Sequence, residues 1–202
     1  MRRREFITLP LGLSLAGQVR IPLRFFTEAE AKVVAAACAR IFPSDASGPG
    51  ANEAGTVIYI DRQLAGPYGR DKFRYTQGPF EASVPEHGYQ GKETPREIYR
   101  AGVAMLEGFA ELTPEQQDEK LRAIEKSLFF QLLRTHTIEG MFSDPLHGGN
   151  VGLVGWQLIG FPGPRMSYRE EVDKHYGEAF RPKPVSLEQV TGRPVRGWEE
   201  ET

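Results

Sequence analysis

The chain has 202 residues, 40% hydrophobic and 26% charged, which is the balance of an ordinary globular domain with a real core. Its formal net charge of −2 provides no concentrated basic face and so argues against a nucleic-acid partner. A single cysteine excludes an intramolecular disulfide and a cysteine-based zinc site. No run reaches the roughly 20 apolar residues that span a bilayer, so we expect membrane contact only through a complex.

Residues 1–24 are typical of a targeting segment rather than of a folded element. Three consecutive arginines precede a short, glycine-containing apolar run. They are part of a sequence similar to the twin-arginine export motif, whose key residues here would be Arg3, Arg4, Phe6 and Ile7. We therefore expect export to the periplasm by that route; the alternative is a basic cytosolic N-terminus.

Twin-arginine export carries folded proteins, usually because a cofactor must be inserted in the cytoplasm first. The rest of this chain shows no Gly-rich dinucleotide loop, no cysteine cluster and no haem motif. The hypothesis that follows is that the cargo requiring this route is a partner protein.

A first helix is predicted from the capping box Thr27-Glu28-Ala29-Glu30 to the stop at Pro43. Its apolar stripe places Cys38 on the buried face, where a free cysteine acts as a small hydrophobe. The alternative is a disulfide from Cys38 to a cysteine of another subunit in an oxidising compartment.

A second helix is predicted from about residue 52 to the turn at 66–69, with Ile60 and Leu64 on its apolar face and Asp61 on the opposite one. The following segment, 70–93, shows no periodicity. Long irregular loops are often functional or ordered by a partner. The aromatic residues of this loop need cover from the core or from a partner, and they are Phe73, Tyr75, Phe80 and Tyr89.

Two further capping boxes, at Thr94 and Thr113, predict helices with proline in the first helical position. The second of these helical runs is expected to break near Ser127 and to continue to about Thr137. A last helix covers about 151–159. The predicted fold is all-α: a compact bundle of five or six helices with long structured loops, covering residues 25–164.

Residues 165–202 form a polar, proline-containing segment, expected to be an extended C-terminal arm. It could lie extended along the surface of a partner protein, because aromatic residues are favoured at interfaces. Its aromatic anchors would be Tyr176, Phe180 and Trp198.

The histidines suggest two pairs with a spacing of three residues, His136 with Glu139 and Asp144 with His147. A spacing of three residues places two metal ligands on the same face only if the segment is helical. Gly140, Pro145 and the glycines at 148–149 are expected to break the helix here. No serine or cysteine is placed for His136 or His147 to activate. Amides of residues 148–150 could bind phosphate, but no lysine, serine or threonine completes such a loop. We expect no catalytic, cofactor-binding or metal-binding residue.

The glycine-rich segment 139–163 carries a resemblance to a known family. The residues Glu139-Gly140-x-Phe142-x-Asp144-Pro145-x-x-Gly148-Gly149-Asn150, followed by Gly155-Trp156-x-x-Ile159-Gly160-Phe161-Pro162-Gly163, are similar to the gluconate 2-dehydrogenase subunit 3 family. The sequence of residues 59–69 and Gly78-Pro79-Phe80 extend the resemblance, which covers about 27–180. His147 departs from the aromatic residue expected there.

The resemblance implies a non-catalytic small, or gamma, subunit of a membrane-associated sugar or sugar-acid dehydrogenase. Its partner would be a large flavoprotein of the glucose-methanol-choline oxidoreductase type, which holds FAD and oxidises the substrate. Electrons would pass to the haem of a cytochrome c subunit or to quinone. The small subunit would assist folding, assembly and twin-arginine co-export of the large one to the periplasmic face of the inner membrane.

On this interpretation, exposed aromatic residues of loops and arm are candidates for the partner interface. They are Phe80, Tyr89, Phe142, Trp156, Phe161, Tyr176, Phe180 and Trp198. Two alternatives stay open. The chain could be a stand-alone periplasmic enzyme that uses His136, Asp144 or His147 with a metal, or a transient chaperone that leaves the mature complex.

Overall fold

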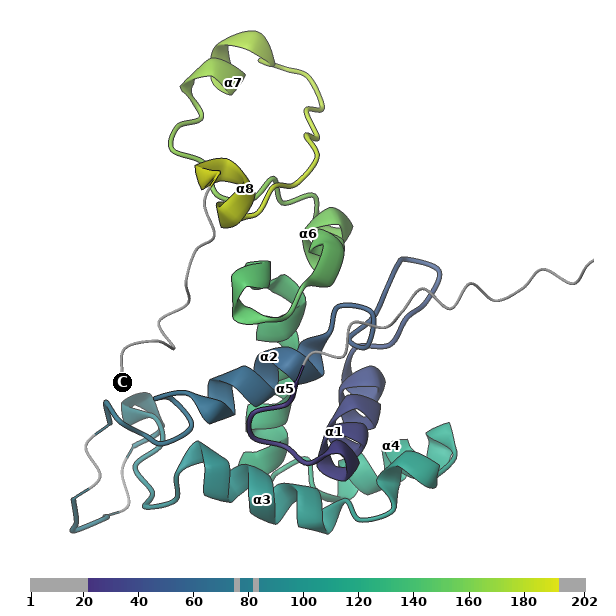
Figure 1. Ribbon diagram of the computed structural model, residues 1–202, viewed down its shortest axis with the longest axis vertical. Helices are drawn as coiled ribbons and strands as arrows, with labels where there is room; N and C mark the ends of the chain where they lie inside the picture. Colours follow the sequence, from purple (N-terminus) through teal and green to yellow (C-terminus); the bar gives the residue numbers. More distant parts are fainter. Residues whose placement is uncertain (1–21, 75–76, 82–83, 193–202) are drawn as a thin grey trace, which may run out of the picture.

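The computed structural model describes residues 22–74, 77–81 and 84–192 (Figure 1). These residues form eight α-helices and no β-strand, which confirms the predicted all-α class. Within this described part, no helix has the length and apolar character needed to cross a membrane. The proposed export-motif residues and Trp198 lie outside the described residues.

Helix α5 (Leu128–Phe142) is the centre of the body. It packs against α1 (Glu28–Ile41), α2 (Thr56–Ala65), α3 (Pro95–Met105) and α6 (Val154–Ile159). In Figure 1, α3 runs along the bottom of the view, and α4 (Pro114–Ala123) lies beside α1. These six helices make up the bundle predicted from the sequence.

Side-chain caps set where the helices begin. The capping boxes predicted at Thr27, Thr94 and Thr113 are all formed, each with its threonine oxygen accepting from the amide three residues on. Ser127 caps α5 in the same way by accepting from the Phe130 amide, 3.1 Å away. The break predicted near Ser127 is therefore the boundary between α4 and α5, because a cap pairs amides that the helix itself leaves unpaired.

Gly140 does not break a helix, contrary to the prediction. α5 continues through Gly140 and ends at Phe142. A Cβ at position 140 would lie 3.1 Å from the Thr56 side chain, so the glycine lets α2 approach α5 closely. Close packing between helices, rather than a turn, explains this glycine.

The apolar faces of α1, α2, α3 and α5 meet in one hydrophobic core. The stripe predicted on α1 is buried as expected. The largest apolar side chains that are fully buried in this core are Ile60, Leu64, Tyr99, Leu106, Phe109, Leu133 and Met141.

Beyond α6 the arm loops away from the bundle and returns to it (Figure 1). It contains two short helices, α7 (Arg169–Lys174) and α8 (Leu187–Thr191), where the sequence predicted an extended segment. A capping box of Ser186 and Gln189 starts α8, a signal the sequence interpretation missed. Two hydrogen bonds tie its return to the body: Val185 N to Pro162 O at 3.2 Å, and Leu187 N to Asp144 Oδ2 at 2.8 Å.

Candidate partner interface

A buried polar cluster surrounds His136 in the middle of α5. The ring is 3% exposed and bonds on both sides, with Tyr99 Oη 2.7 Å from Nδ1 and Tyr68 Oη 2.9 Å from Nε2. One helical turn along, Glu139 accepts a hydrogen bond from Tyr59 Oη at 3.0 Å. Burial lowers the pKa of His136 to about 4, so the imidazole is neutral near pH 7.

The hydrogen bonds of this cluster select one tautomer of His136. Tyr99 is fully buried, and among the described residues its hydroxyl proton has only Nδ1 as a recipient. Nδ1 therefore accepts, and Nε2–H donates to Tyr68. A neutral ring whose two nitrogens are both occupied by tyrosines has no free site for a substrate or a metal, so the cluster has the character of a structural network.

The structure does not bring together the three residues of the stand-alone-enzyme alternative. Asp144 caps a short 3₁₀ turn by accepting from Leu146 N, and its second oxygen holds the arm through Leu187 N. His147 is half-buried in that same turn. Over the described residues, no group of three or more His, Cys, Asp or Glu side chains could hold a metal ion.

The 148–150 segment uses its polar groups for the fold, not for an anion. Asn150 is fully buried: its amide nitrogen donates to Ser143 O, and its oxygen accepts from Gly155 N. The backbone amides of Gly148 and Asn150 donate to Pro145 O and Gly140 O. The suggested phosphate role is therefore wrong for these amides.

Cys38 is buried, as its helical stripe predicted. Its sulfur is 0% exposed and accepts a hydrogen bond from Thr137 Oγ1 at 3.3 Å. Burial raises the pKa of the thiol to about 11, so it stays protonated and unreactive. The alternative of an inter-subunit disulfide at Cys38 does not fit this fold, because α1 would have to leave the core first.

Asp61 was predicted on the outer face of α2 but is 1% exposed. Its two carboxylate oxygens accept from three consecutive backbone amides: Oδ2 from Arg24 at 2.7 Å, and Oδ1 from Phe25 at 3.0 Å and Phe26 at 2.8 Å. The chain that enters the body is thus fixed against α2. Sequence periodicity could not reveal this, because the partners lie 35 to 37 residues away.

The candidate interface aromatics fall into two surfaces at different ends of the molecule (Figure 1). The loop surface, between α2 and α3, contains Phe73, Phe80 and Tyr89, which are 83%, 44% and 36% exposed. Tyr89 is partly satisfied within this loop, since it donates to Glu93 and packs under the Arg74 guanidinium. Phe73 borders a mostly apolar cavity of about 620 Å³ that also includes Tyr68.

The arm surface follows α6 and α7. Its most exposed apolar residues are Ile159, Phe161, Met166, Tyr168, Val172, Tyr176 and Phe180. Val172 lies in α7, Tyr168 is the N-cap of this helix, and Tyr176 follows its C-cap. A cavity of about 820 Å³ lies between α6 and residues 180–184, with Arg181 and Lys183 beside Phe161 and Phe180.

Two of the candidate interface residues belong mainly to the interior. Trp156 is 4% exposed, donates through Nε1 to Phe142 O at 2.7 Å, and packs edge-on against Phe161. Phe142 is half-buried and packs edge-on against Phe42. Trp156 thus has little surface left for a partner and instead supports the exposed Phe161.

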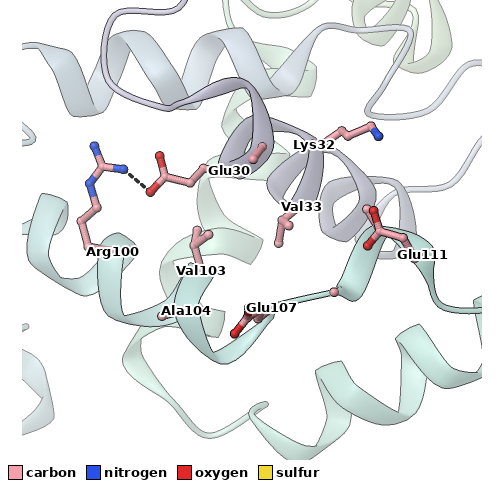
Figure 2. A pocket seen from close by; sticks show the side chains of 11 residues that line it. Glu30, Lys32, Val33, Arg100, Val103, Ala104, Glu107 and Glu111 are labelled. Carbon is pink, nitrogen blue, oxygen red and sulfur yellow. Dashed lines mark hydrogen bonds and ion pairs between the residues drawn. The ribbon is translucent and has the colours of Figure 1, made fainter.

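A third surface, not predicted from the sequence, is a groove between α1 and the end of α3 (Figure 2). Its volume is about 550 Å³, and Val33 and Val103 face each other across it. Carboxylates border it at Glu30, Glu107 and Glu111. We call this the α1–α3 groove.

The family model of gluconate 2-dehydrogenase subunit 3 matches residues 28–163. The chain belongs to this subunit 3 family. Neither the curated proteins nor the solved structures searched gave a match. The subunit 3 match begins at α1 and ends directly after α6.

The three surfaces of this subunit 3 chain differ in whether the residues matched by the family model include them. The loop surface and the α1–α3 groove lie inside the matched residues. Most of the arm surface lies beyond residue 163. The residues that the family model matches therefore contain the six helices of the body, and α7 and α8 of the arm lie outside the match.

Proposed function

We propose that this protein is the small accessory subunit of a periplasmic FAD-dependent gluconate or sugar dehydrogenase, and that it assists the folding, assembly and twin-arginine co-export of the large flavoprotein subunit. Membership of the subunit 3 family supports a place in such a complex. The remaining steps rest on the surfaces and on the export-like leader.

The observation that carries the proposal is apolar surface that the described part of the chain leaves uncovered. Met166, Tyr176 and Phe73 are 99%, 90% and 83% exposed. Burial of apolar area is favourable by about 25 cal/mol per Å², so large uncovered apolar side chains favour a bound partner. Aromatic residues and methionine are also the types enriched in protein–protein interfaces.

The roles that we assign to the subunits of the complex follow from the resemblance and from the chemistry of this chain. We assign FAD and substrate oxidation to a partner of the glucose-methanol-choline type, and haem to a cytochrome c subunit that receives the electrons. The polar cluster around His136 supports a structural role for this chain, because both ring nitrogens are bonded to tyrosines. Attachment to the inner membrane would come through the complex.

Co-expression tests the proposal directly. A tagged copy of this chain, produced with the flavoprotein, should be recovered as a stoichiometric complex, and in higher yield than the chain produced alone. Replacing Arg3 and Arg4 by lysine should leave both subunits in the cytoplasm. Normal periplasmic delivery of the flavoprotein by the lysine variant would contradict co-export, and a stable chain without affinity for the flavoprotein would contradict the accessory role.

The same purification separates the alternatives. Presence of the chain in the mature periplasmic complex supports a resident subunit, whereas its loss after assembly identifies a transient chaperone. A stand-alone enzyme would lose turnover on replacement of His147 by asparagine while assembly stayed intact.

A further inference from the structure

The α1–α3 groove has an apolar floor and an acidic end. Val33 and Val103 form its floor together with small residues of both helices (Figure 2). At the near end, Glu30 is paired with Arg100. At the far end, the carboxylates of Glu107 and Glu111 form no ion pair with any side chain in the described part of the chain, and both residues are exposed. Lys32 also lines the groove, so its lining carries three carboxylates against the two cations Lys32 and Arg100. With this small excess of negative charge, the groove suits a ligand with apolar side chains and positive charge.

The N-terminal segment enters the body beside this groove. Arg100, which lines it, donates to Phe25 O at 2.9 Å and packs over the Phe25 ring at 4.1 Å. Residues 24–26 are held there by Asp61. Whatever precedes residue 22 therefore starts close to the Arg100 end of the groove.

The chemistry of residues 1–21 matches that of the groove. This leader has four arginines against one glutamate. Its apolar side chains include Phe6, Ile7, Leu9, Leu11, Leu13 and Leu15. The C-terminal segment 193–202 is the poorer match, since Glu199, Glu200 and Glu201 would meet the carboxylates of the groove.

Chain length allows the contact. From Arg100 to the end of α3 at Met105 the distance along the helix axis is about 8 Å, at 1.5 Å per residue, and Glu107 follows two residues later. A leader of 21 residues can extend about 70 Å. A tethered segment of this length also has an effective concentration on the order of millimolar, so even a weak contact would be well populated.

We propose that the leader folds back into the α1–α3 groove, with its apolar residues over Val33 and Val103 and Arg2 to Arg4 beside Glu107 and Glu111. The contact is between parts of one chain and does not depend on the proposed function. One consequence does: in the free chain the export arginines are covered, and they become available when a partner competes for the groove.

Cross-linking of the full chain, produced without the flavoprotein, tests this contact. Cysteines are introduced by Ile7→Cys and Ala104→Cys and treated with a short bismaleimide; Cys38 is buried and stays unlabelled. Trypsin should then release residues 5–20 joined to residues 101–120. The matched control pairs Ile7→Cys with Gln157→Cys, an exposed position on α6. We expect the link at position 104 and at most a trace at position 157.

Charge variants sharpen the test. Glu107→Gln with Glu111→Gln should lower the yield of the link about fivefold. Glu119→Gln with Glu125→Gln, which removes the same charge from exposed positions outside the groove, should leave the yield unchanged. High salt should also lower the yield of the link, because it screens the attraction between the arginines and the carboxylates.

Equal linking at positions 104 and 157, or no link at either, would overturn the proposal. A link found only in covalent dimers would assign the groove to a second copy of the chain and would overturn it as well. Because the flavoprotein is absent from this experiment, failure of the partner proposal would not alter its outcome.

Discussion

At the scale of single residues, the buried polar groups of this protein serve the fold. His136 is the clearest case, because burial alone lowers its pKa from an ordinary 6.5 to about 4. In the unfolded chain the ring binds a proton near pH 6.5, whereas in the native chain it does not. The native state is therefore favoured above pH 6.5 and loses stability as the pH falls towards 4.

We predict that the free energy of unfolding falls by up to about 3 kcal/mol between pH 6.5 and pH 4 because of His136. Chemical denaturation of dilute protein, followed by circular dichroism, measures this. Carboxylates with lowered pKa, such as Glu97 and Asp118, add to the loss only towards the acid end of the window.

Two variants, His136→Gln and His147→Gln, test whether His136 or the carboxylates cause the fall in the free energy of unfolding. His136→Gln should flatten the dependence between pH 6.5 and pH 5, even if the variant is less stable throughout. His147→Gln should keep the dependence of the parent chain. An unchanged slope in His136→Gln would show that this ring is not the source.

Asp61 leads to a second prediction at the same scale. Asp61→Asn keeps one acceptor oxygen but places an NH₂ group against the Arg24 amide, and we expect a cost of about 2 kcal/mol. Asp61→Ala leaves three amides without their acceptor and should cost more. Gln63→Ala on the same helix should change stability by less than about 0.5 kcal/mol. Equal effects of the Asp61 and Gln63 variants in thermal unfolding would contradict this account.

At the scale of elements, the backbones of α5 and α6 approach closely at one glycine. A Cβ on Gly155 would lie 1.9 Å from Met141 O, a contact that only backbone movement could relieve. Asn150 joins the two helices from the other side, through Ser143 O and Gly155 N. The position of α6, and with it of Phe161, depends on this contact.

We predict that Gly155→Ala destabilises the protein by about 3 kcal/mol, because overpacking against a rigid carbonyl forces the helices apart. Gly160→Ala is the matched control: it has positive φ but nothing within 4 Å of the added Cβ, so it should cost only about 1 kcal/mol. Thermal unfolding compares the two. A Gly160→Ala variant as unstable as Gly155→Ala would refute the packing explanation.

At the scale of the whole molecule, the body and the arm present apolar surface at opposite ends. The buried polar side chains described in the body are bonded within it, except for Ser143 Oγ, whereas the apolar side chains in and around α7 are exposed. Stability and partner binding should therefore be separable by mutation. The arm is the place to test this, because few contacts tie it to the body.

We predict that Val172→Ser with Tyr176→Ser lowers recovery of the flavoprotein complex at least about tenfold, as expected for loss of an exposed aromatic anchor. The melting temperature of the chain should stay the same, because Val172 and Tyr176 are exposed. Asp173→Ser on the same helix is the control and should leave recovery unchanged. Full recovery by the double variant in quantitative co-purification would remove α7 from the interface.

Much of the local structure could be predicted from the sequence. Threonine caps at positions 27, 94 and 113 and the apolar stripe of α1 depend on neighbours within a few residues, and these features are correct in the structure. The sequence order of the glycine, proline and aromatic residues of 139–163 was likewise sufficient to identify the family. Short-range hydrogen bonding and helical periodicity act through adjacent residues, so they can be read from order alone.

Only the tertiary structure decided which polar residues are buried and what each glycine does. Asp61 was assigned to the outer face and Gly140 to a helix break, yet the first binds amides 35 to 37 residues away and the second admits α2 beside α5. The pairing of His136 with Tyr68 and Tyr99 and the α1–α3 groove arise in the same way. Each depends on segments that are distant in sequence and meet only when the helices pack, so no local pattern specifies them.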